Sequence, residues 1–189
     1  LTSLLQDVPQ MDLTDLAKEF QIMAERVVQE GIALIPDDTY QAELTIDGPP
    51  NAEQIDSYDP VRLSLSILKK NNTLDLDFSG SDKQLENQPI NVPISYTLAD
   101  SIYAVQYLMA PDIPNIGPQF SPVTVLAPKG NILSAVPPVP VYARTRTGLH
   151  INTLLNSALA EIFPKQVQAA SGHAIILTVS GYYEQRDFF

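Results

Sequence analysis

One stretch of the sequence combines residue types that could do chemistry: DLDFSGS, from Asp75 to Ser81. Paired carboxylates such as Asp75 and Asp77 can bind a metal ion or transfer protons, and Ser79 adds a hydroxyl group. On an extended strand both carboxylates would project from one face, roughly 7 Å apart. A solvent-exposed strand face explains the same pattern more simply, so both interpretations stay open at this point.

The usual arrangements for nucleophilic, metal and phosphate chemistry are missing from the sequence. There is no G-x-S-x-G elbow, and Ser171-Gly172-His173 is a small polar loop. The two histidines, His150 and His173, do not form an H-x-x-x-H pair, and the aspartates near Asp75 lack the glycine and distal glutamate of a calcium loop. Residue spacing alone therefore assigns no reaction.

Hydrophobic alternation predicts the strands that would position the acidic pair. Residues Tyr40–Ile46 alternate apolar and polar side chains, and so do Val61–Lys69 and Leu74–Phe78. Asn71-Asn72 separates the last two runs, and asparagine tolerates the left-handed conformation of a tight turn. The sequence thus predicts an antiparallel hairpin whose outer face carries Asp75 and Asp77. Short strands are also predicted at 123–127 and 174–183.

Three helices are predicted from apolar residues at helical spacing. The first spans Asp12–Gly31, with Gly31 closing it and an apolar stripe of Leu13, Leu16, Phe20, Met23 and Val27. The second spans Thr97–Met109, with Thr97 and Asp100 spaced like a capping box and a stripe of Leu98, Ile102, Val105 and Leu108. The third spans Leu149–Phe163, with Leu154, Leu155, Ala158, Leu159 and Ile162 facing inward.

The fold class that follows is α+β, a mixed domain in which antiparallel hairpins pack with about three helices. Residues 111–140 contain eight prolines, which predicts a long ordered loop that either builds a site or wraps a neighbour. The chain starts at Leu1 and stops at Phe188-Phe189 within strand-like sequence. We therefore expect a segment of a longer protein that associates when isolated.

Charge and composition exclude several classes of partner. The net charge is −11, and all of the excess acidity lies before Asn87, with 17 acidic and 6 basic residues against 5 of each afterwards. Such a chain repels phosphate backbones and anionic lipid, which argues against nucleic acid and membrane surfaces as partners. No apolar run is long enough to span a membrane. We expect a soluble protein, with the cytoplasm as its compartment.

An ordered series of motifs resembles the hydantoinase B/oxoprolinase family. The series covers about four fifths of the chain and comprises IPDDTYQAELTIDG, LDLDFSGSDKQLENQPINVP, MAPDIPNIGPQFSPVTVLAPKGNIL, PPVPVYARTRTG and NSALAEIFPKQVQAASGH. Two loop positions depart from the family pattern, namely Asp38 where glycine is usual and Asn131 where serine or threonine is usual. These departures concern substrate identity more than membership.

The resemblance implies a central segment, residues 1–189, of the B-type part of an ATP-dependent cyclic-amide hydrolase that opens hydantoin or 5-oxoproline rings. It implies a hydantoinase A/oxoprolinase-type ATPase as partner in a hetero-oligomer, with ATP and a divalent metal both bound outside this segment. The isolated segment would then be inactive. Two alternatives remain: the α-type subunit of an ATP-dependent acetone or acetophenone carboxylase, and a non-catalytic scaffold segment.

Several residues match the family pattern and become candidates for the site. The candidates for catalysis are Asp77, Asn91, Arg144 and His173. The candidates for substrate binding or loop ordering are Ser79, Gly80, Asn115, Gly117 and Gly172. Turn conformation explains the glycines and asparagines without any role in catalysis, and an ion pair would explain Arg144.

Overall fold

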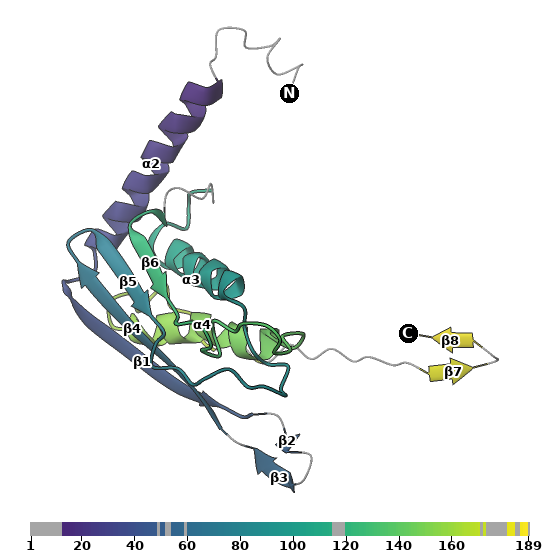
Figure 1. Ribbon diagram of the computed structural model, residues 1–189. Helices are drawn as coiled ribbons and strands as arrows, with labels where there is room; N and C mark the ends of the chain where they lie inside the picture. Colours follow the sequence, from purple (N-terminus) through teal and green to yellow (C-terminus); the bar gives the residue numbers. More distant parts are fainter. Residues whose placement is uncertain are drawn as a thin grey trace.

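The computed structural model describes residues 13–48, 50–51, 54–58, 60–114, 120–170, 172, 181–183 and 186–188. Its main body has two layers, a four-stranded sheet with helices α3 and α4 packed on one face (Figure 1). The apolar core lies between these layers, and the polar residues of the strands face away from it. The α+β fold predicted from the sequence is confirmed.

The main sheet has the strand order β1-β4-β5-β6, with β1 spanning Asp38–Ile46, β4 Val61–Lys70, β5 Thr73–Asp77 and β6 Val123–Leu126. The predicted hairpin is present: β4 and β5 are antiparallel, and Asn71 in their turn has a φ of 53°. The buried residues of β4 and β5 are those that the alternation predicted. Strand β6 adds a feature that the alternation did not predict, because it pairs with β5 in parallel.

Two small hairpins lie outside the main sheet. Strands β2, Pro50–Asn51, and β3, Gln54–Tyr58, pair with each other, as do β7, Gly181–Tyr183, and β8, Arg186–Phe188. Most of the strand predicted at 174–183 lies outside the described residues. No helix in the described ranges is both long enough and apolar enough to cross a membrane.

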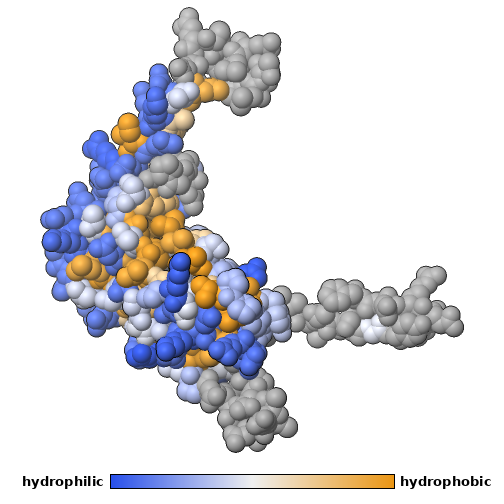
Figure 2. Space-filling model, in the orientation of Figure 1, coloured by the Kyte–Doolittle hydropathy of each residue, from blue (hydrophilic) through white to orange (hydrophobic). Residues whose placement is uncertain are grey.

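Helix α2 spans Leu13–Ala33, two residues beyond the predicted end at Gly31. Gly31 does not close this helix. Its missing side chain leaves room for the end of α3, since a Cβ there would lie 2.5 Å from the Met109 carbonyl oxygen. The buried face of α2 is also rotated from the predicted stripe, so that Phe20 and Met23 are 48% and 52% exposed. Hydrophobic residues gather over α3 and continue along α2 (Figure 2).

Helix α3 spans Ile94–Met109 and begins three residues before its predicted start. The predicted capping box is wrong, because Pro93 occupies the N-cap and the Thr97 hydroxyl donates a hydrogen bond to the Leu133 carbonyl oxygen at 2.5 Å. The inward stripe is corrected as well, since Leu98 is 40% exposed while Ser101 and Ala104 are buried.

Helix α4 spans Thr145–Ala158, so it starts four residues earlier and stops five residues earlier than predicted. Beyond Ala158 the chain continues in turns, and Leu159 and Phe163 still pack in the core. Helix α4 packs against α3 and against strands β1 and β4. The helix layer therefore covers one face of the sheet, and among the described residues the face that carries Asp75 and Asp77 is left uncovered.

Candidate functional site

A row of polar and aromatic side chains follows the junction of helices α3 and α4. We call it the α3–α4 seam, and it consists of Tyr96, Asp100, Tyr103 and Tyr107 from α3 with Gly148, Asn152 and Asn156 from α4. Residues spaced by three and four positions lie on one face of a helix, which explains why these side chains form a single row. The sequence interpretation missed this row, because Asp100 was assigned to the capping box.

Close contacts hold both ends of the seam together. At one end the Tyr96 ring packs directly on Gly148, where an added Cβ would overlap the ring. At the other end Asn156 donates a hydrogen bond to the Tyr107 hydroxyl and another to the Asn152 carbonyl oxygen at 2.7 Å. The Tyr103 ring leans on Tyr107, with ring centroids 5.4 Å apart.

Asp100 occupies the middle of the seam without a counter-charge. Burial raises the pKa of its carboxyl group from 3.8 to about 6. None of the ion pairs among the described residues includes Asp100. Burial also raises the pKa of the Tyr96 phenol, the charge of Asp100 raises it further, and Arg144 opposes both effects. Arg144 is therefore the basic group that acts on this end of the seam.

A second uncompensated acceptor lies on the α4 side of the seam. The side-chain oxygen of Asn152, Oδ1, is buried and has no hydrogen-bond partner among the described residues. Leaving such an atom without a donor costs on the order of 1–3 kcal/mol. Together with Asp100, the seam presents two acceptors whose donors are not supplied by the described part of the chain.

Asp77, Ser79 and Gly80 form one tight turn at the end of β5. Asp77 Oδ1 accepts a hydrogen bond from the Ser79 backbone nitrogen at 2.8 Å. A Cβ at Gly80 would lie 2.8 Å from the Ser64 hydroxyl oxygen, so a larger residue there would require the Ser64 side chain to shift. These contacts give all three residues a part in building the turn.

The uncovered face of the sheet contains a shallow hollow of about 480 Å³. Asp75 and Asp77 line it beside Ser66, and Thr39 and Thr124 add hydroxyl groups from β1 and β6. The two carboxylates thus share a face, as the strand alternation predicted. The hollow is open and its acidic residues are partly solvated.

Asn91 is fully buried and ties distant loops together. Its Nδ2 donates to the carbonyl oxygens of Leu85, Gln88 and Pro140 at 2.8, 2.7 and 3.0 Å, and its Oδ1 accepts from the Leu85 nitrogen at 2.7 Å. Its amide group is thus occupied by the backbone. Asn91 therefore orders the loops that it joins.

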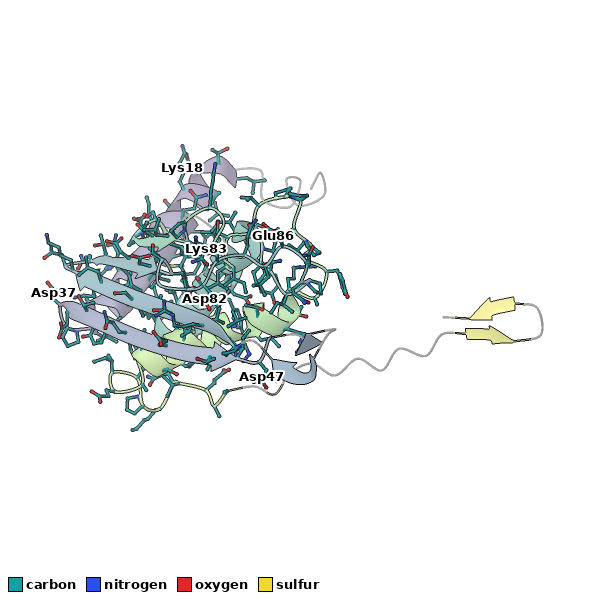
Figure 3. All side chains as sticks on the ribbon, turned by 60° about the horizontal axis from the view of Figure 1, so that its bottom comes forward. Lys18, Asp37, Asp47, Asp82, Lys83 and Glu86 are labelled. Carbon is teal, nitrogen blue, oxygen red and sulfur yellow. The ribbon has the colours of Figure 1, made fainter. Side chains whose placement is uncertain are left out.

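Asn131, one of the departures from the family pattern, performs a similar task. Its Nδ2 donates to the carbonyl oxygens of Phe78 and Ser81, both at 3.1 Å, and its Oδ1 accepts from the Leu133 nitrogen at 2.8 Å. The proline-rich segment is therefore anchored to the turn after β5. The loop that follows β5 also carries Asp82, Lys83 and Glu86, and Asp37 lies immediately before β1 (Figure 3).

Arg144 is exposed and immediately precedes α4. The backbone nitrogen of Ala143 donates to the Pro89 carbonyl oxygen at 3.0 Å, so Arg144 is placed beside the loop that Asn91 organises. Gly172 is exposed, with open space where a Cβ would lie. The candidates Asn115, Gly117 and His173 lie outside the described residues.

The described residues on either side of 115–119 join the sheet away from the turn after β5. The loop after Met109 returns to β6 at Pro122, whose carbonyl oxygen accepts from the Leu74 nitrogen at 3.0 Å near the start of β5. The turn formed by Asp77, Ser79 and Gly80 follows the other end of β5. The segment flanking Asn115 and Gly117 thus joins the sheet at the end opposite that turn (Figure 1).

The acidic and histidine side chains of the described ranges do not build a metal centre. No three side chains of histidine, aspartate or glutamate in these ranges converge closely enough to hold an ion. The family resemblance places the divalent metal outside this segment, and no chemical step is assigned to a metal here.

Two solved structures share this fold. An ATP-dependent caprolactamase from Pseudomonas jessenii superimposes with a TM-score of 0.77 at 18% identity, covering 98% of this chain and 32% of the other. A nucleotide-free acetone carboxylase superimposes with a TM-score of 0.64 at 14% identity, covering 78% of this chain and 21% of the other. At these identities the likeness concerns the fold.

Sequence relatives add the family. A protein provisionally assigned as the B component of a D-/L-hydantoinase, from Pseudomonas sp. (strain NS671), is 30% identical over 175 residues, which cover 87% of this chain and 29% of the relative. An uncharacterised protein from Methanocaldococcus jannaschii is 28% identical over 122 residues, covering 64% of this chain and 22% of the relative. The chain thus spans less than a third of the length of these relatives. Its match to the family pattern extends over residues 1–189, and the chain belongs to the hydantoinase B/oxoprolinase family.

Proposed function

We propose that the chain is a central segment of the B-type component of an ATP-dependent enzyme that hydrolyses cyclic amides. The observation that carries this proposal is the 30% identity to a protein provisionally assigned as the B component of a D-/L-hydantoinase, in a chain that matches the family throughout its length. The fold shared with an ATP-dependent caprolactamase supports it, since caprolactam is also a cyclic amide. An A-type ATPase component would be the partner.

The division of labour follows from the chemistry of amides. An unactivated amide is a poor electrophile, so its hydrolysis needs an activating group, and ATP supplies one when the carbonyl oxygen is phosphorylated. The described residues of this chain contribute a rigid set of loops, because Asn91 and Asn131 fix the segments around 78–92 and 128–143. Arg144 is an exposed cation at the edge of this frame, next to Ala143, and its role would be to orient an anionic substrate group.

The direct test uses the full-length protein together with its A-type component. Hydantoin, 5-oxoproline and caprolactam are offered in turn, and ADP release and ring-opened product are measured. We expect product only when ATP and both components are present. Failure to open any of the three rings, with both components folded and associated, would remove the proposal.

Arg144 allows a sharper test within the same assay. Arg144→Gln removes the charge at the start of α4, whereas Arg146→Gln removes an exposed charge two residues further along the same helix and serves as the matched control. We expect kcat/KM to fall on the order of tenfold or more for Arg144→Gln and to stay unchanged for Arg146→Gln. Equal activity of both variants, with association retained, would instead favour a scaffold role for this segment.

A second candidate function is supported by the fold shared with acetone carboxylase. In that case ATP consumption would depend on a ketone and on bicarbonate rather than on a cyclic amide. Offering acetone with and without bicarbonate in the same ADP-release assay distinguishes the two reactions.

A further inference from the structure

The hydrogen bonds of β4 show which backbone groups of β1 point away from the sheet. The Arg62 backbone nitrogen donates to Asp82 Oδ2 at 2.8 Å, and the Ser64 backbone nitrogen donates to the Ser81 hydroxyl oxygen at 2.9 Å. These even-numbered residues of β4 therefore bond on the side away from β1. Because backbone groups alternate in direction along a strand, the odd-numbered residues of β4 bond to β1, and their partners in β1 are even-numbered. The outward backbone groups of β1 belong to Thr39, Gln41, Glu43 and Thr45.

This outer edge of β1 is open in the described part of the chain. Strand β1 ends the strand order and pairs with β4 alone. The Thr39 backbone nitrogen donates to Asp38 Oδ1 at 2.7 Å, as expected for a group that points away from β4. The backbone N–H groups of Gln41, Glu43 and Thr45 bond to no described residue, and their side chains are exposed. A nine-residue edge of this kind is a template for another strand.

The sequence of β1 is complementary to itself when a second copy lies antiparallel to it. Ala42 is the midpoint of Asp38–Ile46, so a two-fold axis at Ala42 pairs the whole strand with its copy. Outward backbone groups then meet outward groups. In this centred register Gln41 faces Glu43 and Tyr40 faces Leu44, while Thr39 faces Thr45. Amide–carboxylate, aromatic–aliphatic and Thr–Thr pairs across two strands are each favourable.

Other two-fold registers are poorer, and the charge of the edge is locally compensated. An axis at Glu43 would oppose two carboxylates, and an axis at Gln41 would leave the Thr45 backbone groups without partners. Glu43 already lies 3.5 Å from Arg62, and Asp37 lies 2.6 Å from Lys69. The acidity of the first half of the chain therefore weighs least along the middle of this edge.

The size of the edge fits a weak dimer. Nine residues extend about 30 Å. Helix α4 packs on β1, so the contact is two layers deep, or roughly 20 Å. The product, about 600 Å² for each copy, is somewhat below the roughly 800 Å² of a standard interface. Tyr40, Ala42 and Leu44 are only partly buried at the margin of the core, and a second strand would cover them.

We propose that two copies of this chain associate through the outer edge of β1, antiparallel and centred on Ala42, and join their main sheets into one. The proposal goes beyond the proposed function and does not depend on it, because it concerns assembly rather than a reaction. Figure 1 shows β1 at the rim of the main sheet, and Figure 3 places Asp37 and Asp47 at its two ends. The centred register brings Asp47 of one copy toward Asp37 of the other.

The test combines sedimentation equilibrium with amide hydrogen exchange on the 189-residue chain, from about 10 μM to about 1 mM. We expect a monomer–dimer equilibrium with a dissociation constant in the range of about 0.1–1 mM. The amides of Gln41, Glu43 and Thr45 should exchange more slowly as the concentration rises. The amides of Ala42 and Leu44, which bond to β4, should be protected at every concentration.

Charge variants test the register. Gln41→Glu places a carboxylate opposite Glu43 and should weaken the dimer at least about fivefold, whereas Gln41→Lys should strengthen it. Gln21→Glu adds the same charge at an exposed position of α2 and is the matched control, with a change of less than about twofold. Asp47→Asn relieves repulsion at the ends of the edge, so it should strengthen the dimer. Added salt should strengthen it as well.

Each measurement can also overturn the proposal. A chain that stays monomeric up to about 1 mM would refute it. Association without slower exchange at Gln41, Glu43 and Thr45 would assign the contact to another surface. Equal effects of Gln41→Glu and Gln21→Glu, with both variants folded by circular dichroism, would reduce the contact to net charge. A dimer weakened by Asp47→Asn would contradict the centred register.

Discussion

Replacing Asp100 with asparagine tests the electrostatics of the seam directly. Burial raises the pKa of this carboxyl from 3.8 to about 6 in the folded chain. At a pH below the pKa of the unfolded chain, the Asp100 carboxyl group is protonated in both the folded and the unfolded state, and its burial does not lower stability. As the pH rises through the folded value, the charged form is disfavoured in the folded state, and stability is lost. The asparagine of the variant would stay neutral at every pH.

The size of the effect follows from the shift. A difference of roughly two pKa units corresponds to about 3 kcal/mol between the protonation states. Asp100 is only half-buried, so water relaxes part of this cost, and we expect Asp100→Asn to stabilise the folded chain by about 1–2 kcal/mol near pH 8. Near pH 4 the variant and the unmodified chain should be almost equally stable.

Urea unfolding followed by circular dichroism at unit steps from about pH 4 to about pH 8 measures this difference. Comparing the two chains at each pH cancels the titration of every other group. The midpoint for the variant should move above that of the unmodified chain as the pH rises, with an unchanged slope. A difference that is constant with pH, or a variant less stable at the alkaline end, would refute the assignment of Asp100 as an uncompensated buried charge.

Three further predictions concern stability. Asn91→Ala removes four hydrogen bonds to the backbone and should lower the free energy of unfolding by about 2–4 kcal/mol, measured in urea, whereas Asn87→Ala, exposed in the same loop, should change it by less than about 0.5 kcal/mol. Gly148→Ala places a methyl group against the Tyr96 ring and should lower stability by about 1–3 kcal/mol, while Gly172→Ala, which meets open space, should be neutral; equal melting temperatures would contradict this. The hydrogen bonds that Asp37 accepts from Lys69 and from the Asn71 nitrogen lower the pKa of its carboxyl group. Asp37→Asn should therefore lower the melting temperature near pH 7. The difference in melting temperature between the two chains should vanish as the pH falls below 3.8 and through the pKa of Asp37 in the folded chain.

Local patterns predicted the sheet well. The alternation in Val61–Lys69 and Leu74–Phe78 decided which side chains are buried, because the period of a strand is two and a slip of one residue would expose the whole apolar set. The Asn71-Asn72 turn followed from the conformational tolerance of asparagine. The shared face of Asp75 and Asp77 was predicted on the same ground.

Tertiary contacts overrode the local patterns in the helices. Thr97 is spaced as a cap for α3, but its hydroxyl finds a carbonyl oxygen in the proline-rich segment, and the helix starts earlier. Gly31 has the character of a helix end, but its small size is used for the approach of Met109 from another helix. Leu133 is far from Thr97 in the sequence, and Met109 is far from Gly31, so residue spacing could not predict either contact.

The seam was missed for a related reason. Tyr96, Asp100, Tyr103 and Tyr107 lie on one face of α3, and this spacing was available in the sequence. Their significance depends on α4, which brings Gly148 and Asn152 alongside and turns an ordinary polar face into a partly buried one. Asn91 shows the reverse case, because a motif position suggested chemistry and the structure shows its amide group engaged in four hydrogen bonds with the backbone.

The parallel pairing of β5 with β6 has a consequence for how the chain folds. Strands β1, β4 and β5 are neighbours in the sheet and are joined by comparatively short connections, so they can zip together early. Strand β6 joins β5 only across an intervening stretch that includes all of α3, with Leu74 opposite Val123. Closing that long loop is entropically costly until α3 has docked on the sheet. The edge strand should therefore acquire its amide protection last on refolding and lose it first when the chain opens.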